Sequence, residues 1–174
     1  MIQDDKPTTQ LLINIAEQTL ILYRQHNEVG RYAISTATNG SGSQQDSGCT
    51  PLGEHTIAQK IGDSEPINTV FIGRVPTGEI YSAHLNAEHP DRDWILSRII
   101  WLAGLEDGIN KSSNNQGSCD TYQRYIYIHG TPDSEPMGIP RSHGCVRMRN
   151  HDIIELFAQV NVGTPVTITD DIIG

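Results

Sequence analysis

The side chains best suited to chemistry lie close together in residues 128–150, IHGTPDSEPMGIPRSHGCVRMRN. This stretch contains Cys145 and two histidines, His129 and His143. A cysteine thiolate is a strong nucleophile, and a neighbouring imidazole can lower the pKa of the thiol and accept its proton. A core cysteine does not require polar flanks, a preceding glycine and two local histidines. The pattern therefore predicts that Cys145 is a catalytic nucleophile.

The residues around Cys145 predict how a reacting substrate would be held. Gly144 allows a tight turn and leaves bare N–H groups near the sulfur, where they can bind the oxyanion of a tetrahedral intermediate. Arg147 lies two residues beyond Cys145 and can meet a substrate carboxylate. The choice of base stays open, because His143 is two residues away on the same face of an extended backbone, whereas His129 follows a predicted strand.

Other reactive side chains are expected to be structural. Cys49 and Cys119 are expected to be inert buried thiols or loop thiols. A zinc site built from His129, His143 and Cys145 has suitable ligand types, but a structural zinc site needs four ligands and usually a close cysteine pair. The sequence thus predicts no metal and no cofactor. The residues expected at the surface are His26, His84, His89, His151, Arg141 and Arg149, and His55 stays undecided.

Short apolar runs predict the strands that must position these residues. A hairpin is expected over 11–15 and 19–23, and further strands over 31–37, 56–58, 70–72, 97–102, 125–128 and 165–169. The last strand is expected at a sheet edge because it begins with proline. Polar stretches at 39–48 and 110–120 predict loops. His129 would then lie at the end of the strand over 125–128.

One helix is predicted after Asn150, which is a suitable N-cap residue. Apolar residues recur at helical spacing from Ile153 to Val160, and Gly163 is expected to end the helix. Many short strands with one main helix predict a mainly β fold, a sandwich or an open barrel, in a single domain over residues 1–174.

Composition and charge exclude several other classes. The 174-residue chain carries 12 Lys and Arg against 21 Asp and Glu, a net charge of −9. Such a chain lacks the electrostatic footprint of a nucleic-acid binder and is not expected on an anionic membrane surface. No apolar run is long enough to cross a membrane, and the polar start does not resemble a secretory signal. With three cysteines, an odd number, this favours a cytoplasmic location, or a periplasmic one if an upstream signal peptide has been removed.

At these residues the sequence resembles the L,D-transpeptidase catalytic domain family, also called the YkuD-like domain. The family signature is a histidine followed further along the chain by Ser/Thr-His-Gly-Cys, a hydrophobic residue and often arginine. Here the signature residues are His129 and the segment from Ser142 to Arg147, and Thr50-Pro51-Leu52-Gly53 resembles the Thr-Pro-x-Gly turn of the family. The resemblance covers about residues 10 to 170 and implies a β-sandwich-like fold with the cysteine and histidine in a groove.

The resemblance also implies a reaction on peptidoglycan stem peptides. Cys145 would attack the carbonyl of the L-configured centre at the third residue, release D-alanine and form a thioester. His129 would act as base and acid, with its ring oriented by the Gly130 carbonyl. His143 would shape the site, and the amides of Gly144 and Cys145 would line the oxyanion hole.

Two further residues are assigned to the substrate by the resemblance. Arg147 would bind the terminal carboxylate of the peptide, and Ser142 would lie beside the bound substrate.

Three functions follow from these assignments. If water resolves the thioester, the enzyme is an L,D-carboxypeptidase acting on soluble muropeptides. If an amine of a neighbouring stem resolves it, the enzyme is an L,D-transpeptidase that forms cross-links, and the third alternative is a non-catalytic module that binds wall peptides. We expect hydrolysis, because the chain starts without a signal peptide, contains nothing that tethers it to a wall polymer, and faces water in large excess over any amine.

Overall fold

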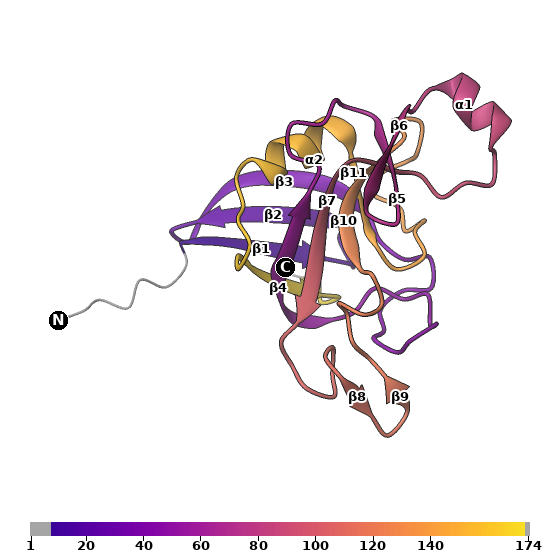
Figure 1. Cartoon of the computed structure of the whole chain (residues 1–174). Helices are drawn as coiled ribbons and strands as arrows, with labels where there is room; N and C mark the ends of the chain where they lie inside the picture. The colour runs from indigo at the N-terminus through magenta and orange to yellow at the C-terminus, as the bar shows by residue number, and fades with distance from the viewer. Residues whose placement is uncertain (1–7, 173–174) are drawn as a thin grey trace.

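The computed structural model describes residues 8–172 and contains a long, strongly curved sheet (Figure 1). The short apolar runs of the sequence form its strands because β-branched and aromatic side chains pack well on a pleated surface. The strands in this range are β1 (Thr9–Asn14), β2 (Thr19–Arg24), β3 (Asn27–Ser35), β4 (Gly53–Ile61), β5 (Thr69–Ile72), β6 (Val75–Ile80), β7 (Ile95–Gly104), β8 (Ser113–Asn114), β9 (Gly117–Ser118), β10 (Tyr127–Thr131), β11 (Val146–Arg149) and β12 (Pro165–Thr169).

The sheet closes on itself, which leaves only one branch with a free edge. Neighbouring strands follow the order β10-β11-β3-β2-β1-β12-β4-β7, and β10 also pairs with β7 to complete the ring. The β5–β6 hairpin extends from β7 outside this ring. The predicted mainly β class is confirmed, and the barrel is closed where the sequence analysis expected a sandwich or an open barrel.

The core fills the inside of the ring and the space under the second helix. Its largest fully buried side chains come from most of the ring strands, among them Ile13, Leu22, Ile34, Leu102 and Ile128. Helix α2 (Asn150–Phe157) packs against β7, β10 and β11 through the buried face formed by Ile153, Leu156 and Phe157. The pocket-bearing strands β10 and β11 are therefore backed by a packed core and a helix.

Several predicted elements need correction. The strand at the C-terminal end, β12, is not an edge strand, because it pairs with β1 on one side and β4 on the other. Its proline is tolerated there because Pro165 is the first residue of the strand. Helix α2 ends at Phe157, before Val160 and Gly163, and the loop over 110–120 contains the small β8–β9 hairpin.

Asn150 was expected to be the N-cap of this helix, and that expectation is wrong. The N-cap position is Arg149, with no side-chain cap, while Asn150 is the first helical residue. Its buried amide side chain accepts a hydrogen bond from the Ser97 hydroxyl at 2.6 Å and donates to the Thr131 carbonyl at 2.9 Å. A tertiary contact has replaced the local cap.

A short helix, α1 (Ala83–Glu88), was not predicted and follows the β5–β6 hairpin at the far end of the molecule in Figure 1. Among the described residues, no helix is long and apolar enough to cross a membrane.

Candidate active site

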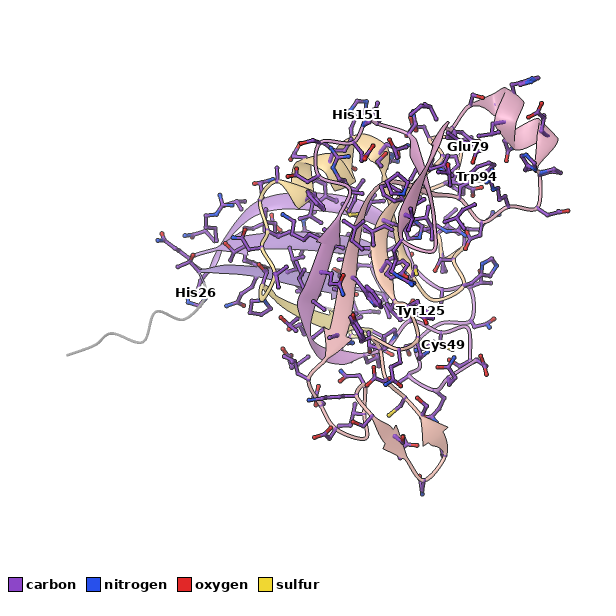
Figure 2. The ribbon with its side chains drawn as sticks, in the orientation of Figure 1. His26, Cys49, Glu79, Trp94, Tyr125 and His151 are labelled. Atoms are coloured by element: carbon purple, nitrogen blue, oxygen red, sulfur yellow. The ribbon has the colours of Figure 1, made fainter. Side chains whose placement is uncertain are left out.

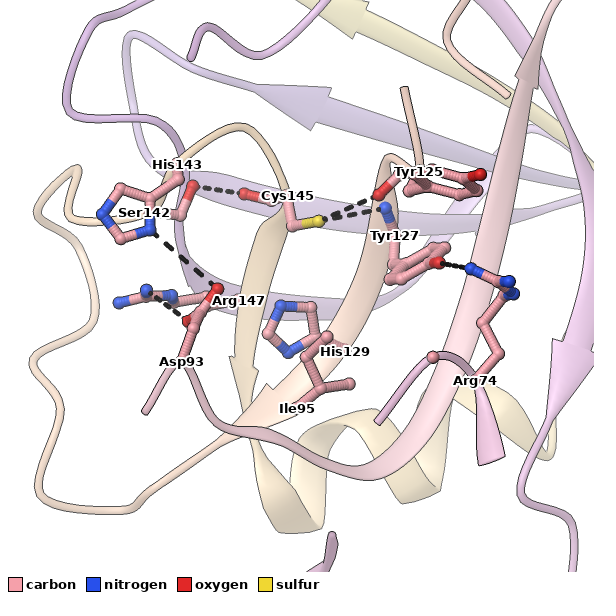
Figure 3. A pocket seen from close by; sticks show the side chains of 11 residues that line it. Arg74, Asp93, Ile95, Tyr125, Tyr127, His129, Ser142, His143, Cys145 and Arg147 are labelled. Atoms are coloured by element: carbon pink, nitrogen blue, oxygen red, sulfur yellow. Dashed lines mark hydrogen bonds and ion pairs between the residues drawn. The ribbon is translucent and has the colours of Figure 1, made fainter. Parts of the chain in front are cut away.

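One pocket of about 300 Å³ brings together five of the seven predicted site residues (Figure 3). Cys145, His129, His143, Ser142 and Arg147 all line it. They come from β10, β11 and the turn before β11, and the chain from β5 to β7 supplies the opposite wall. Its other lining residues are Gly73, Arg74, Asp93, Ile95, Tyr125 and Tyr127.

The Cys145 thiol is held between two backbone groups. Its sulfur accepts a hydrogen bond from the Tyr127 N–H at 3.3 Å and donates to the Tyr125 carbonyl at 3.4 Å. Burial raises the pKa of the Cys145 thiol to about 11, and the Tyr127 N–H opposes that shift because it favours the thiolate. The resting sulfur is therefore protonated near neutral pH and needs a base to become a nucleophile.

His129 is 1% exposed and lies in the middle of β10, not at a strand end as expected, because the strand continues to Thr131. Its Nδ1 is 2.7 Å from the Gly130 carbonyl, so Nδ1 carries a proton that it donates to this oxygen. Nε2 is then left with a free lone pair. Burial lowers the pKa of His129, which keeps the ring neutral and able to accept a proton.

Gly130 occupies a position that admits no side chain. A Cβ there would lie 2.5 Å from the Leu96 carbonyl oxygen and 2.7 Å from Asn150 Oδ1. The pairing of β10 with β7 shifts register between His129 and Gly130, where Ser97 with a φ of +70° sits in the extra length of β7. This close backbone approach sets the direction of the Gly130 carbonyl that holds the His129 ring.

The turn before β11 is stabilised by its own side chains and by Thr50. The Ser142 hydroxyl donates to the Cys145 carbonyl at 2.5 Å and accepts from the Gly144 N–H at 3.3 Å. Thr50 donates to the Gly144 carbonyl at 2.9 Å and accepts from the Ala37 N–H at 3.0 Å. Gly144 has a φ of +137°, which a side chain would strain. The contact of Ser142 with substrate and the oxyanion role of Gly144 stay predictions.

Arg147 is paired with a carboxylate that sequence reasoning missed. Its side chain is 10% exposed and its Nη2 lies 3.1 Å from Oδ1 of Asp93, a residue on the segment between α1 and β7. His143 is 80% exposed at the mouth of the pocket, with Nδ1 3.9 Å from Asp93 Oδ2. No local motif marks Asp93 among the acidic residues of its segment, because only the fold brings it beside β11.

An aromatic wall with one arginine was also missed. The Arg74 guanidinium donates to the Tyr127 hydroxyl at 3.0 Å and lies 5.0 Å and 4.9 Å from the ring centres of Trp101 and Tyr125. Tyr125 is 53% exposed and has a φ of +57°, a conformation that costs energy in a bulky residue and directs its carbonyl toward Cys145.

The remaining predicted residues lie outside this pocket. Cys119 is buried and Cys49 half-buried, and all three thiols are free. His55 is undecided no longer, since it is buried between the Gly53 carbonyl and the Thr121 hydroxyl, each at 2.9 Å. Within residues 8–172, no three His, Cys, Asp or Glu side chains are grouped to hold a metal ion. The residues confirmed as exposed are His26, His84, His89, His151, Arg141 and Arg149, of which Figure 2 labels His26 and His151.

Comparison with known proteins gives a consistent match over this fold and site. Residues 8–168 match the YkuD family, described as the L,D-transpeptidase catalytic domain. The "Probable L,D-transpeptidase YbiS" of Escherichia coli K12 is 50% identical over 116 residues, which cover 64% of this chain and 35% of that protein. The "Probable L,D-transpeptidase YcfS" of the same strain is 29% identical over 164 residues, 94% of this chain and 45% of that protein. The chain thus spans less than half the length of these relatives.

Solved structures share the fold at low sequence identity. L,D-transpeptidase 3 from Mycobacterium tuberculosis, in complex with a faropenem-derived adduct, has a TM-score of 0.57 at 16% identity and is covered over 94% of this chain and 61% of its own. An L,D-transpeptidase from Mycobacterium smegmatis has a TM-score of 0.54 at 17% identity, with coverage of 93% and 58%. The family match over nearly all described residues decides the assignment, and the chain belongs to the YkuD family of L,D-transpeptidase catalytic domains.

Proposed function

We propose that this chain is a cysteine-dependent L,D-carboxypeptidase that removes the terminal D-alanine from peptidoglycan tetrapeptide stems. The observation that carries the proposal is the Cys145 thiol in one pocket with a buried, neutral His129 whose Nδ1 proton is held by the Gly130 carbonyl. A neutral imidazole with a defined tautomer is what a general base requires.

In the first half-reaction, His129 Nε2 takes the Cys145 proton as the sulfur attacks the carbonyl of the third residue. The oxyanion that forms is received by the backbone amides of the turn, those of Gly144 and Cys145. Because the Gly144 N–H contacts Ser142 at the long distance of 3.3 Å, it can exchange that partner for the oxyanion. The imidazolium of His129 then protonates the leaving amine, and D-alanine departs from a thioester on Cys145.

In the second half-reaction, His129 takes a proton from water, and the resulting hydroxide attacks the thioester. The proton returns to the sulfur as the carbon–sulfur bond breaks, which restores the thiol and frees the tripeptide. The support for water as acceptor is that Cys145 is half-buried and that His143, at the pocket mouth, is largely exposed, so solvent reaches the site.

Substrate contacts are proposed for the polar groups that line the pocket. Arg147 would receive the terminal carboxylate of the stem, as a carboxypeptidase requires, although its guanidinium is already shared with Asp93. His143 would contact the peptide at the pocket mouth, and Ser142 would lie beneath it.

A second function, L,D-transpeptidation, is favoured by a separate observation. A cavity of about 280 Å³ lies on the other side of His143, and its lining residues are Gln45, Asp46, Gly48, Arg124, Ile126 and His143. A second stem bound there could bring an amine to the thioester. The names of the relatives agree with this alternative.

The products of the reaction distinguish these functions. The purified protein is incubated with a disaccharide tetrapeptide, and the products are identified by mass spectrometry, with Cys145→Ala as the control. Tripeptide and free D-alanine in equal amounts support the carboxypeptidase. Dimers linked between two third residues as the main product would replace it with the transpeptidase, and unchanged substrate would leave only a binding module.

A further inference from the structure

Asp93 is the single carboxylate among the described residues that line the pocket. Its side chain is 54% exposed, and it faces two cationic or polar neighbours, Arg147 and His143. The rest of the charge in the pocket is positive, from Arg147 and Arg74. A cation that enters this pocket therefore has one anionic partner.

We propose that Asp93 is a specificity-determining residue that selects donor stems whose third residue carries a side-chain ammonium group, such as lysine or another diamino acid. The inference rests on the proposed function, because it concerns the substrate of the same site, and it adds a substrate class to that function.

The two oxygens of Asp93 are in different situations. Oδ1 is 3.1 Å from Arg147 Nη2, which is a charge-assisted hydrogen bond. Oδ2 faces His143 at 3.9 Å, which is too long for a hydrogen bond. Oδ2 thus keeps its acceptor capacity at the pocket mouth, while Oδ1 holds the carboxylate in place through an arginine that is itself 10% exposed.

Asp93 is also close enough to the reacting groups to sense what they bind. Its charge acts on both the Cys145 thiol and the His129 ring, and the charge of Arg147 acts on both in the opposite sense. A third residue whose carbonyl is attacked by Cys145 would place its own side chain within a few ångströms of the attacked carbon. An ammonium at the end of that side chain can reach Oδ2 at the pocket mouth.

The arginines leave no other position for such a cation. Arg74 is held by the Tyr127 hydroxyl and by the rings of Trp101 and Tyr125, so this wall repels an ammonium. Arg147 repels it as well, and only the outer side of Asp93 attracts it. The pocket is thus complementary to a substrate that carries a cation toward its mouth and a carboxylate toward its arginines.

The competing explanation is that Asp93 serves only to hold Arg147. The two explanations differ in what a change of substrate does. A purely structural Asp93 affects all substrates alike, whereas a specificity residue affects only those with the ammonium group.

The test compares two tetrapeptides that differ only in the third residue, L-lysine against Nε-acetyl-L-lysine, with wild-type protein, Asp93→Asn, Asp93→Glu and Asp91→Asn. Asp91 is the matched control, because it is an exposed acidic residue of the same segment that does not line the active pocket. Release of D-alanine and the mass of the acyl-enzyme are measured for each pair, and kcat/KM is compared.

We expect the wild type and Asp91→Asn to prefer the lysine peptide by about fivefold in kcat/KM, the upper range for a partly exposed ion pair. Asp93→Asn should lose the preference by slowing only the lysine peptide, and Asp93→Glu should retain part of it. Equal rates on both peptides in the wild type, a preference that persists in Asp93→Asn, or an equal loss on both peptides in that variant would each overturn the inference. Absence of any acyl-enzyme with either peptide would instead refute the proposed function on which it rests.

Discussion

Replacing Gly130 with alanine tests whether the backbone of β10 positions the base. The new methyl group would sit 2.5 Å from the Leu96 carbonyl oxygen, about 0.9 Å closer than ordinary van der Waals contact begins. The second neighbour, Asn150 Oδ1, is also buried and hydrogen-bonded to Ser97. Neither neighbour is the free end of a flexible side chain, so β10 and β7 must separate by most of that distance.

The cost of this separation falls on both stability and rate. Overpacking of a core contact costs about 1–3 kcal/mol of unfolding free energy. Because the Gly130 carbonyl holds Nδ1 of His129, a shift of this size moves the base, and a displacement of about 1 Å at a catalytic group can cost on the order of a hundredfold in rate.

The assay follows D-alanine release together with urea unfolding, so that rate is expressed per folded molecule. Gly104→Ala is the matched control, because a Cβ there would clash with the Asn110 carbonyl at the opposite end of β7, away from the pocket. We expect Gly130→Ala to lose rate and stability, and Gly104→Ala to lose stability alone. A folded Gly130→Ala variant with wild-type kcat would refute the proposed link between this glycine and the base.

Three further predictions concern single side chains. His129→Ala should slow acylation of Cys145 by about 10²–10⁴-fold, the range for general-base catalysis, whereas His143→Ala should cost under about tenfold because His143 is largely exposed; stopped-flow acylation measures both, and the reverse order would assign the base to His143. Thr50→Val should reduce the unfolding free energy by about 1–3 kcal/mol, since it leaves the Ala37 N–H and the Gly144 carbonyl without their buried partner, and an unchanged urea midpoint would contradict this. Burial lowers the pKa of His55 to about 4 in the folded protein, so between about pH 6.5 and 4 the unfolded chain binds a proton that the folded chain does not; stability should fall with decreasing pH in that window by up to about 1.4 kcal/mol per pH unit, and His55→Gln should remove this contribution, which urea titrations at several pH values would test.

Much of the fold could be predicted because the signals were local. The strands at both ends of the ring, β1, β2 and β12, follow apolar runs bounded by turn residues, and the structure confirms them. The position of β12 between β1 and β4 could not be predicted, because a proline at the first position of a strand is compatible with an edge or with the interior of a sheet.

The site divides along the same line. Cys145 and His143 share one turn, and its chemistry is visible in consecutive residues. Asp93 and Arg74 could not be found, because they reach the pocket from other segments and resemble any surface charge in the sequence. Asn150 was assigned the role that its neighbours in sequence suggest, whereas the buried Ser97 and Thr131 offered stronger partners.

The central claim, that Cys145 carries the acyl group, is tested most directly by the mass of the intact protein quenched during turnover of a tetrapeptide. We expect a single adduct equal to the tripeptide acyl group, removed by hydroxylamine, located on Cys145 by peptide mapping and absent from Cys145→Ala. The same adduct should form in Cys49→Ala and Cys119→Ala, whose thiols lie outside the pocket. An acyl group on another residue, or D-alanine release by Cys145→Ala at more than a few per cent of the wild-type rate, would contradict the claim.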